Sequence, residues 1–390
     1  MKSVLDMKLE ELPGLSFMCS CGRNHSVNIK KLVVRSDITE GLVTALMPFK
    51  ESKLFVLADA NTYAAFGKTV TEKLLEAGFL VESLVYEPGD TMLLPDERAI
   101  GRLLVEAGQD TSMVLAVGSG VITDIARIVS HRTGKLFAVA ATAPSMDGYA
   151  SVVSSLLING KKHTYHGQYP YAIFADTSIM RNAPMDMIRA GYGDVLGKLT
   201  ALADWRLSRI VNGEYYCETT AELVKNAVDK CIESSGGLAS RDEKSIHYLI
   251  EALILTGISI GFAGVSRPAS GTEHQLAHYW EMKAIEAGHE RALHGNAVGA
   301  GTVVAAALYE LAAPMLPEGI KYPSAELVIK LLEKAGACTN PAGLGVGRDM
   351  FADGMRNAMH INDRYTILRF CHDKGKLKQF TEVLARRFYD

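Results

Sequence analysis

The sequence predicts an α/β domain followed by an all-α domain, because two different patterns succeed each other along the chain. Through about residue 180, short apolar runs alternate with amphipathic segments, which is typical of βαβ units and a parallel sheet. After that point the segments are long, helix-periodic and rich in Ala, Leu and Ile. We therefore expect a Rossmann-like parallel sheet within residues 1–180 and a purely helical domain within residues 181–390.

The predicted strands of the first half are short apolar runs, each bounded by turn residues or by an amphipathic segment. They comprise KLFVLADA (53–60), FLVESLVY (79–86), TSMVLAVGSG (111–120), KLFAVAAT (135–142) and YAIFAD (171–176). Between the last two, SVVSSLLING and KKHTYHG predict an inserted hairpin. Helices are expected over residues 70–78, 97–108 and 121–134, where apolar positions recur with a helical period.

In the second half, the segment 186–210 predicts a long helix, and two others are apolar around most of the helix circumference. These two, residues 243–264 and 295–314, are expected to be buried helices. Their length approaches that of a bilayer span, but the embedded Glu251 and the polar flanks argue against membrane insertion. We therefore expect them inside the helical domain.

The overall composition is that of a soluble enzyme. The 390 residues are 48% hydrophobic and 22% charged, and a formal net charge of -3 gives no electrostatic reason for binding nucleic acid or an anionic membrane. The N-terminal stretch MKSVLDMKLEELPG is interrupted by charges and lacks the apolar core of a signal peptide. The six scattered cysteines indicate reduced thiols. We expect a cytoplasmic protein.

The segment CSCGRNH near the N-terminus contains three side chains that can bind zinc, Cys19, Cys21 and His25. A C-x-C pair has no second half nearby in the sequence, however. We therefore interpret the segment as a surface hairpin or turn.

A glycine turn between a predicted strand and a predicted helix is the first candidate binding site. Gly118, Ser119 and Gly120 would let the backbone approach a phosphate, which the free N–H groups of the helix N-terminus then face. The third glycine of the dinucleotide fingerprint is missing, so a simple tight turn explains the pattern as well.

The next predicted strand ends in a second turn of small residues, ATAPSMDGYAS, which offers hydroxyl groups, a proline break and one carboxylate. The residues concerned are Thr142, Pro144, Ser145, Asp147 and Ser151. Asp59, at the end of an earlier strand, could accept hydrogen bonds from ribose hydroxyls and would disfavour the 2′-phosphate of NADP. Its alternative role is an ordinary helix N-cap.

Histidines in the second half predict a metal site. His274 and His278 are four positions apart and would share one helix face. Gln275 stands where a zinc protease would carry its glutamate base, so that class is disfavoured. His294 follows in a small-residue segment, with His289 as its competitor, and Asp194 in AGYGDVLGK is the best carboxylate ligand, with pairing to Lys198 as its alternative.

In their order along the chain, GSGVITD, TAPSMDGYAS, AGYGDVLGKLTALADW, SGTEHQLAHYWE and HGNAVGAG resemble the family of iron-containing alcohol dehydrogenases and dehydroquinate synthases. The resemblance spans nearly the whole sequence, from CSCGRNH to RYTIL. It implies a dehydroquinate-synthase-like fold with a nucleotide-binding half and a helical metal-binding half. It is greatest to the bacterial branch that acts on glycerol 1-phosphate, which shares the Gly118-Ser119-Gly120 turn.

The resemblance also implies roles for individual residues. Asp194, His274 and His294 look like ligands of one divalent ion, nickel or zinc with iron as the alternative. His278 and Asp147 look like substrate contacts, and Asp194 would share that role. The nucleotide contacts that it implies are Asp59, Gly118, Ser119, Gly120, Val121, Ile122, Thr123, Asp124, Thr142, Ala143, Pro144, Ser145 and Ser151.

The reaction implied is the reversible reduction of dihydroxyacetone phosphate to sn-glycerol 1-phosphate with NADH, or less favourably NADPH. Separately, the apolar helices of the second half favour a homodimer. The alternatives are a polyol dehydrogenase without phosphate specificity, a dehydroquinate-synthase-like cyclase, and a non-catalytic sensor that binds metal and nucleotide. A substrate phosphate needs cationic partners. The sequence does not choose among Lys161, Lys162, His163, Lys198 and Arg364.

Overall fold

A six-stranded parallel sheet forms the frame of the first half. The computed structural model describes residues 3–87 and 93–390. The strand order is β3-β10-β7-β6-β4-β5, with every neighbouring pair parallel. The bounds are β3 Lys31–Arg35, β4 Lys53–Asp59, β5 Leu80–Tyr86, β6 Thr111–Gly118, β7 Leu136–Ala141 and β10 Ala172–Asp176. This confirms the predicted parallel sheet.

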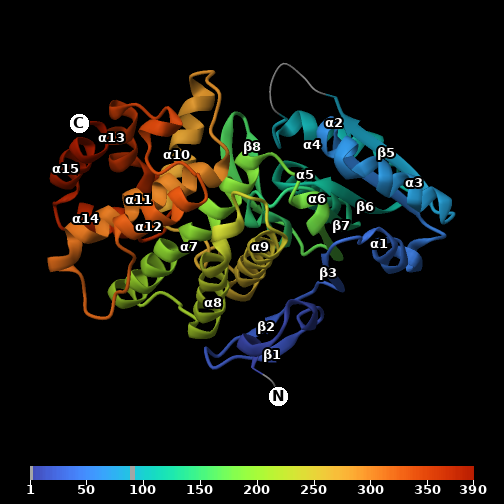
Figure 1. The fold of residues 1–390 in the computed structure, drawn as a ribbon, viewed down its shortest axis with the longest axis horizontal. Coiled ribbons are helices and arrows are strands. Elements are labelled where there is room, and N and C mark those ends of the chain that lie inside the picture. The colour runs from blue at the N-terminus through green and yellow to red at the C-terminus, as the bar shows by residue number, and fades with distance from the viewer. Residues whose placement is uncertain (1–2, 88–92) are drawn as a thin grey trace.

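Short helices connect these strands and cover the sheet (Figure 1). They are α1 Thr39–Leu46, α2 Ala60–Thr62, α3 Lys68–Glu76, α4 Glu97–Glu106, α5 Gly120–Thr133 and α6 Thr177–Met180. One face of the sheet packs on α1 and α3 through a cluster that includes Leu42 and Val70. The core on the other face continues into the helical half, so the two halves share buried apolar contacts.

Two hairpins lie outside the main sheet. The predicted insertion consists of β8 Val153–Ile158 and β9 Lys161–His166, which pair antiparallel. A second, smaller hairpin joins β1 Ser16–Met18 to β2 Asn24–Ser26, and CSCGRNH forms its tip. β1, β2 and the edge strand β3 were not among the predicted strands, because runs of three to five residues interrupted by charges carry little periodicity.

The second half is helical throughout its described residues, as predicted. Its helices are α7 Met185–Asn212, α8 Glu218–Ser234, α9 Glu243–Ala263, α10 Thr272–Glu286, α11 His294–Ala312, α12 Ala325–Lys334, α13 Arg348–Asn357, α14 Ile367–Asp373 and α15 Leu377–Tyr389. The β1–β2 hairpin packs against α9 of this half, below it in Figure 1. A division of domains near residue 180 remains a proposal.

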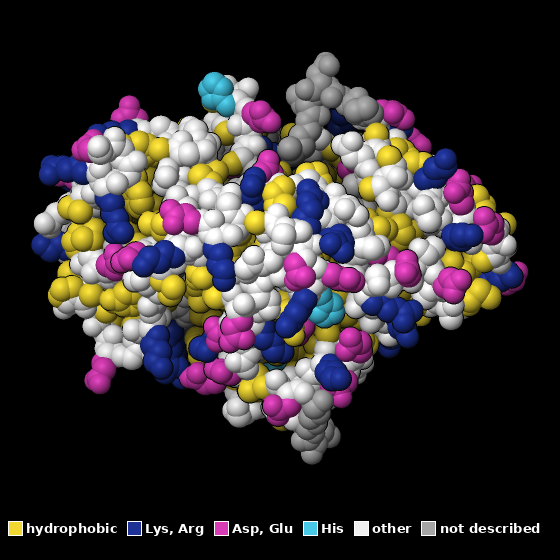
Figure 2. Space-filling view, viewed as in Figure 1, with side chains coloured by type: hydrophobic (Ala, Val, Ile, Leu, Met, Phe, Trp, Pro, Cys, Tyr) yellow, Lys and Arg dark blue, Asp and Glu magenta, His cyan; other side chains and the backbone are white. Residues whose placement is uncertain are grey.

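Two helical stretches are long and apolar enough to cross a membrane, Glu243–Ala263 and His294–Met315. Their apolar windows are 78% and 72% buried inside the structure, as expected for core helices. Figure 2 shows Lys and Arg mixed with Asp and Glu over the visible face, with no extended surface of one sign. Neither feature points to a membrane or a nucleic acid.

Candidate active site

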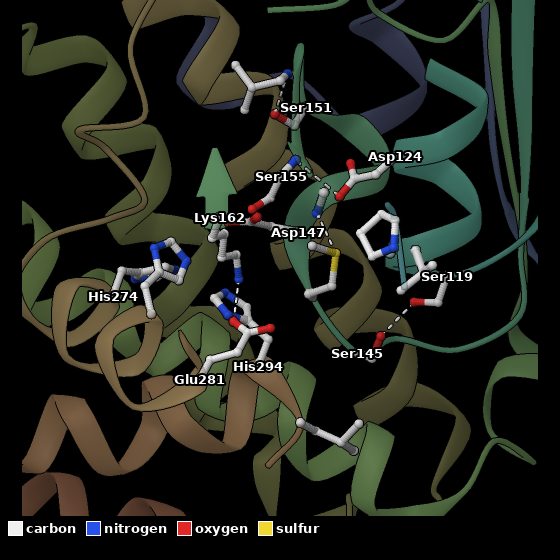
Figure 3. A pocket seen from close by; sticks show the side chains of 18 of the residues that line it. Ser119, Asp124, Ser145, Asp147, Ser151, Ser155, Lys162, His274, Glu281 and His294 are labelled. Carbon is white, nitrogen blue, oxygen red and sulfur yellow. Dashed lines mark hydrogen bonds and ion pairs between the residues drawn. The ribbon is translucent and has the colours of Figure 1, made fainter. Parts of the chain in front are cut away.

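A cavity of about 530 Å³ lies where the α/β half meets the helical half. Its walls include the end of β4, the turn between β6 and α5, the turn after β7, the β8–β9 hairpin, and α10 with the start of α11. Figure 3 shows His274 on one side of this cavity and Ser119 on the other. The predicted nucleotide turn and the predicted metal ligands therefore face a common space.

The three predicted metal ligands come together at the helical side of the cavity. Ligand atoms of Asp194, His274 and His294 all lie within 4.8 Å of one another. Asp194 is fully buried on α7, while His274 and His294 line the cavity. Nδ1 of His294 is buried and has no hydrogen-bond partner among the described residues. One carboxylate and two imidazoles with an open side fit a divalent catalytic ion.

Glu273 orients the first of these histidines, a role that the sequence analysis did not find. Its Oε1 accepts a hydrogen bond from His274 Nδ1 at 2.8 Å, which leaves Nε2 facing Asp194 Oδ1 at 3.4 Å. The Thr200 hydroxyl and the Gly271 N–H hold the same carboxylate. Such a carboxylate–histidine pair fixes the tautomer and direction of a metal-binding imidazole.

Glycines allow the helices that carry these ligands to pack at backbone distance. A Cβ atom on Gly193 would lie 2.3 Å from the carbonyl oxygen of Gly295, and one on Gly295 would lie 1.9 Å from that of Ala190. Because neither position tolerates a side chain, α7 and the start of α11 approach closely enough to bring His294 to Asp194. The glycines noted around Asp194 in the sequence therefore have a packing function.

Lys198 forms the base of the site and binds two carboxylates. Its Nζ lies 2.6 Å from Asp194 Oδ1 and 2.9 Å from Asp147 Oδ2, and the Asp147 N–H donates to Asp194 Oδ2. Burial would raise the pKa of Asp194, but Lys198 and His274 hold it well below its ordinary value. Burial and the charge of Asp194 instead raise the pKa of Asp147, against the effect of Lys198. Lys198 does not line the cavity.

His278 lies beside the ligand set, and its ring stacks on that of His294 with centroids 5.3 Å apart. Burial and the charge of Lys162 hold the pKa of His278 well below its ordinary value, and they lower that of His294 to about 3. Both rings are therefore neutral at physiological pH, which leaves a nitrogen lone pair available to bind a cation. His289, the competing candidate, is exposed in the loop between α10 and α11.

The predicted nucleotide turns meet on the opposite side of the cavity. Ser119 Oγ and Ser145 Oγ are 2.6 Å apart, which joins the β6–α5 turn to the turn after β7. The N-terminus of α5 lies next to them and supplies backbone N–H groups. The predicted contacts that line the cavity are Asp59, Ser119, Gly120, Val121, Ile122, Asp124, Thr142, Ala143, Ser145 and Ser151, whereas Gly118, Thr123 and Pro144 do not line it.

Two of the predicted nucleotide contacts also have structural partners. Asp59 caps α2 by accepting the Thr62 N–H, which is the alternative that the sequence left open, and it still lines the cavity. Asp124 forms an ion pair with the buried Arg127, whose guanidinium also reaches the carbonyl oxygens of Gly148 and Val153. This network fixes the turn after β7 against α5.

Among the cationic candidates for phosphate binding, Arg364 differs from the others. Lys162 is paired with Glu281, and Lys161 does not line the cavity. Arg364 lines the cavity, yet no described carboxylate lies within ion-pair distance of it, and it donates to the hydroxyls of Ser266 and Ser270. Burial and repulsion from Arg267 lower its pKa to about 10, so it stays charged at neutral pH.

Comparisons with known proteins agree with this geometry. The family model described as iron-containing alcohol dehydrogenase matches residues 34–184. A glycerol-1-phosphate dehydrogenase [NAD(P)+] of Halalkalibacterium halodurans is 34% identical over 92% of this chain and 96% of its own length. One of Bacillus velezensis is 34% identical over 90% and 93%.

Solved structures support the fold. A probable glycerol dehydrogenase from Sinorhizobium meliloti superimposes with a TM-score of 0.68 at 18% identity, covering 91% of this chain and 98% of that one. An identity this low supports the fold alone, whereas the relatives of 34% identity extend along nearly the whole sequence. The chain therefore belongs to the glycerol-1-phosphate dehydrogenases, within the iron-containing alcohol dehydrogenase family.

Proposed function

We propose that this chain reversibly reduces dihydroxyacetone phosphate to sn-glycerol 1-phosphate with a nicotinamide cofactor and one divalent metal ion. The observation that carries the proposal is that a single cavity is lined by the α5 turn, by His274 and His294, and by the unpaired Arg364. These features suit, respectively, a dinucleotide phosphate, a metal ion and a substrate phosphate. The names of the relatives agree with this reaction.

Asp194, His274 and His294 would hold the ion, which supplies Lewis acidity toward the carbonyl oxygen when bound, and the cofactor supplies the hydride. The chain's own residues position both. Glu273 keeps His274 Nε2 directed at the ion site, and the α5 N-terminus would orient the dinucleotide phosphates. The carboxylate of Asp59 would accept hydrogen bonds from the ribose hydroxyls. Its charge would repel the 2′-phosphate of NADP and so favour NAD.

We assign proton transfer to His278. Its imidazole lines the cavity beside His294, where it would exchange a proton with the substrate hydroxyl. Asp147 would contact the substrate hydroxyls while Lys198 balances its charge and that of Asp194. Because Lys198 is fully buried and bound to both carboxylates, we assign it no role in phosphate binding.

Arg364 is the proposed phosphate ligand, with the hydroxyls of Ser266 and Ser270 beside it in the cavity wall. Its neighbour Arg267 is neutralised by Glu214, whereas Arg364 has no described carboxylate within ion-pair distance; His163 also lines the cavity but is exposed. A guanidinium binds phosphate oxygens in a bidentate manner, and this contact would distinguish the phosphorylated ketone from a plain polyol.

Further expectations accompany this proposal. We propose nickel or zinc as the ion, because two nitrogens and one carboxylate suit both metals. The six free cysteines suit a cytoplasmic location. The expected homodimer can be tested by sedimentation analysis. The apolar helices from which it was inferred lie largely inside the chain, so they supply no exposed interface themselves.

The decisive experiment follows NADH oxidation after chelation and re-addition of single divalent ions, with dihydroxyacetone phosphate and with dihydroxyacetone. We expect turnover of the phosphorylated ketone to disappear on chelation and to return with nickel or zinc. Equal turnover of both ketones would instead support the polyol dehydrogenase. Binding of NADH without net reduction of either ketone would exclude the proposed reaction and leave the cyclase or the sensor.

A further inference from the structure

Four metal-binding side chains meet at a second place, outside the cavity. Ligand atoms of Cys19, Cys21, His25 and Cys217 all lie within 4.8 Å of one another. Cys19 and Cys217 are 198 positions apart in sequence, yet their Sγ atoms are separated by 3.7 Å. Nε2 of His25 lies 3.4 Å from the Sγ atoms of both Cys21 and Cys217. Cys217 is thus the missing partner of the CSCGRNH segment.

Local backbone structure places each of these side chains. Cys19 and Cys21 stand on the tip of the β1–β2 hairpin, where the Gly22 N–H donates to the Cys19 carbonyl oxygen and Gly22 adopts a φ of 83°, and His25 follows within β2. This left-handed conformation suits glycine and closes the turn tightly. Cys217 is the N-cap of α8, and its Sγ accepts the Thr220 N–H. Hairpin and helix therefore contribute to one cluster.

The spacing matches that of a tetrahedral zinc site. With Zn–S bonds of about 2.3 Å and a Zn–N bond of about 2.05 Å, tetrahedral angles place sulfur atoms about 3.8 Å apart and sulfur and nitrogen about 3.6 Å apart. The Cys19–Cys217 separation is 3.7 Å, the two sulfur–nitrogen separations from His25 to Cys21 and Cys217 are 3.4 Å, and the remaining pairs lie within 4.8 Å. We propose that Cys19, Cys21, His25 and Cys217 bind a structural zinc ion as a Cys₃His site.

The surroundings of the cluster suit an ion with no catalytic role. The Thr219 and Tyr215 oxygens lie 3.4 and 3.3 Å from the Sγ atoms of Cys19 and Cys21, so hydroxyl groups can stabilise both thiolates. The His25 ring stacks on Phe262 at 5.2 Å and is buried. Four protein ligands leave no coordination position for a substrate, which is the arrangement of structural zinc sites.

The ion would fasten the start of the chain to the helical half. β1 and β2 have three residues each, and a two-stranded hairpin of this size has little stability of its own. Through Cys217 the ion would join the hairpin to the connection between α7 and α8. A disulfide between Cys19 and Cys217 is the competing arrangement, but it requires a separation of about 2.05 Å and leaves Cys21 and His25 without a function.

The test is a metal analysis of the full-length protein purified under reducing conditions. In a His274→Ala variant, which lacks the catalytic ion site, we expect one zinc per chain to remain. X-ray absorption should then show three sulfur neighbours at about 2.3 Å and one nitrogen neighbour at about 2.0–2.1 Å. Absence of zinc from this variant, or a neighbour shell without sulfur, would overturn the proposal.

A matched pair of cysteine variants locates the ion. Added to His274→Ala, Cys21→Ser should remove the remaining zinc, whereas Cys338→Ser, at a half-buried cysteine outside the cluster, should keep it. Cys21 is only partly buried, so its serine variant is the one expected to fold. In wild-type protein a thiol-blocking mercurial should release the ion to a colorimetric indicator. Retention of zinc by Cys21→Ser, or a Cys19–Cys217 disulfide found by mass spectrometry in the reduced preparation, would contradict the assignment.

Discussion

The carboxylate–imidazole cluster and the thiol cluster have similar spacing between their ligand atoms but different surroundings. Ligand atoms lie within 4.8 Å of one another in both. The carboxylate–imidazole cluster opens onto a cavity lined by His278, Arg364 and the α5 turn. The thiol cluster is enclosed by Phe262, Tyr215 and the hairpin itself. Three protein ligands beside a cavity leave a coordination position for a substrate, whereas four protein ligands fill it, and this distinguishes a reactive ion from a structural one.

The largest effect is expected from removing a ligand of the open cluster. His274→Ala takes away one of three ligands, so NADH-dependent reduction should fall on the order of 10³-fold together with loss of the catalytic ion. His289→Ala is the control, because that histidine is exposed in a loop. If His274→Ala kept full turnover, the open cluster would not be the reactive one.

The next prediction tests whether the cavity beside the open cluster binds the substrate phosphate. Arg364→Gln removes a charged donor worth about 1.5–3 kcal/mol, so kcat/KM for dihydroxyacetone phosphate should fall about 100-fold. Turnover of unphosphorylated dihydroxyacetone should hardly change. Lys161→Gln, on the exposed edge of β9, provides the control. A parallel loss with both ketones would show that Arg364 does not bind the phosphate.

A smaller effect concerns the orientation of the open cluster. Glu273→Gln keeps the size of the side chain that holds His274 Nδ1 but removes its charge. We expect metal affinity, measured by competition with a chromogenic chelator, to weaken about 10–100-fold. Saturating metal should restore most of the activity, which separates this positioning role from direct catalysis. Unchanged affinity would assign Glu273 to helix packing alone.

The charges in the cavity wall also predict a dependence of stability on pH. Burial opposes ionisation of Glu281, but Lys162 and Arg291 lower its pKa to about 2, below the ordinary 4.5. As the pH falls, the unfolded state therefore binds the Glu281 proton before the folded state does. The contribution of Glu281 to the free energy of unfolding, on the order of 2 kcal/mol, is present above about pH 4.5 and disappears between about pH 4.5 and 2.

Urea unfolding at several pH values measures this contribution. The dependence on pH over that interval should be shallower in Glu281→Gln than in the wild type. Glu290→Gln, at an exposed site in the α10–α11 loop, should retain the slope of the wild type. If the free energy of unfolding depended on pH equally in all three proteins, Glu281 would not contribute to this pH dependence.

The smallest expected change is in thermal stability, when the two clusters are compared directly by chelation. Mild EDTA treatment should remove the ion of the open cluster and all turnover, while the melting temperature changes little. The thiol-bound ion should leave only after mercurial treatment, because enclosed thiolate sites exchange slowly. Simultaneous loss of both ions would show that the two clusters are equally accessible.

Much of this arrangement was predictable from sequence, but the missing parts share a physical cause. The turn at Gly118 and the ligands Asp194, His274 and His294 occur in short segments with recognisable spacing. The role of Glu273 could not be predicted, because a glutamate next to a histidine in the sequence does not indicate where its side chain points. The choice of Arg364 depends on which cations lack carboxylate partners, and this emerges only from tertiary packing.

Cys217 could not be predicted as a partner of CSCGRNH either, because the two are far apart in the sequence. It is one of six scattered cysteines and lies far from CSCGRNH in the sequence, whereas spacing rules for zinc sites assume ligand pairs that lie near each other. The sequence predicted a surface hairpin or turn at CSCGRNH; the hairpin is present, but Cys19 and His25 are buried and not on the surface. Its contact with the start of α8 depends on how the β1–β2 hairpin packs on the helical half, which no local pattern encodes.

The close approach of Gly191 to Pro144 has a consequence for how hydride donor and acceptor are aligned. A Cβ atom at position 191 would fall 1.7 Å from the Pro144 carbonyl oxygen. The backbone of the helix that carries Asp194 therefore packs directly against the backbone of the turn after β7. No rotamer change can adjust such a contact. We therefore expect Gly191→Ala to push the turn that contains Pro144 away from the helix of Asp194, and so to change the separation of the two sides of the cavity.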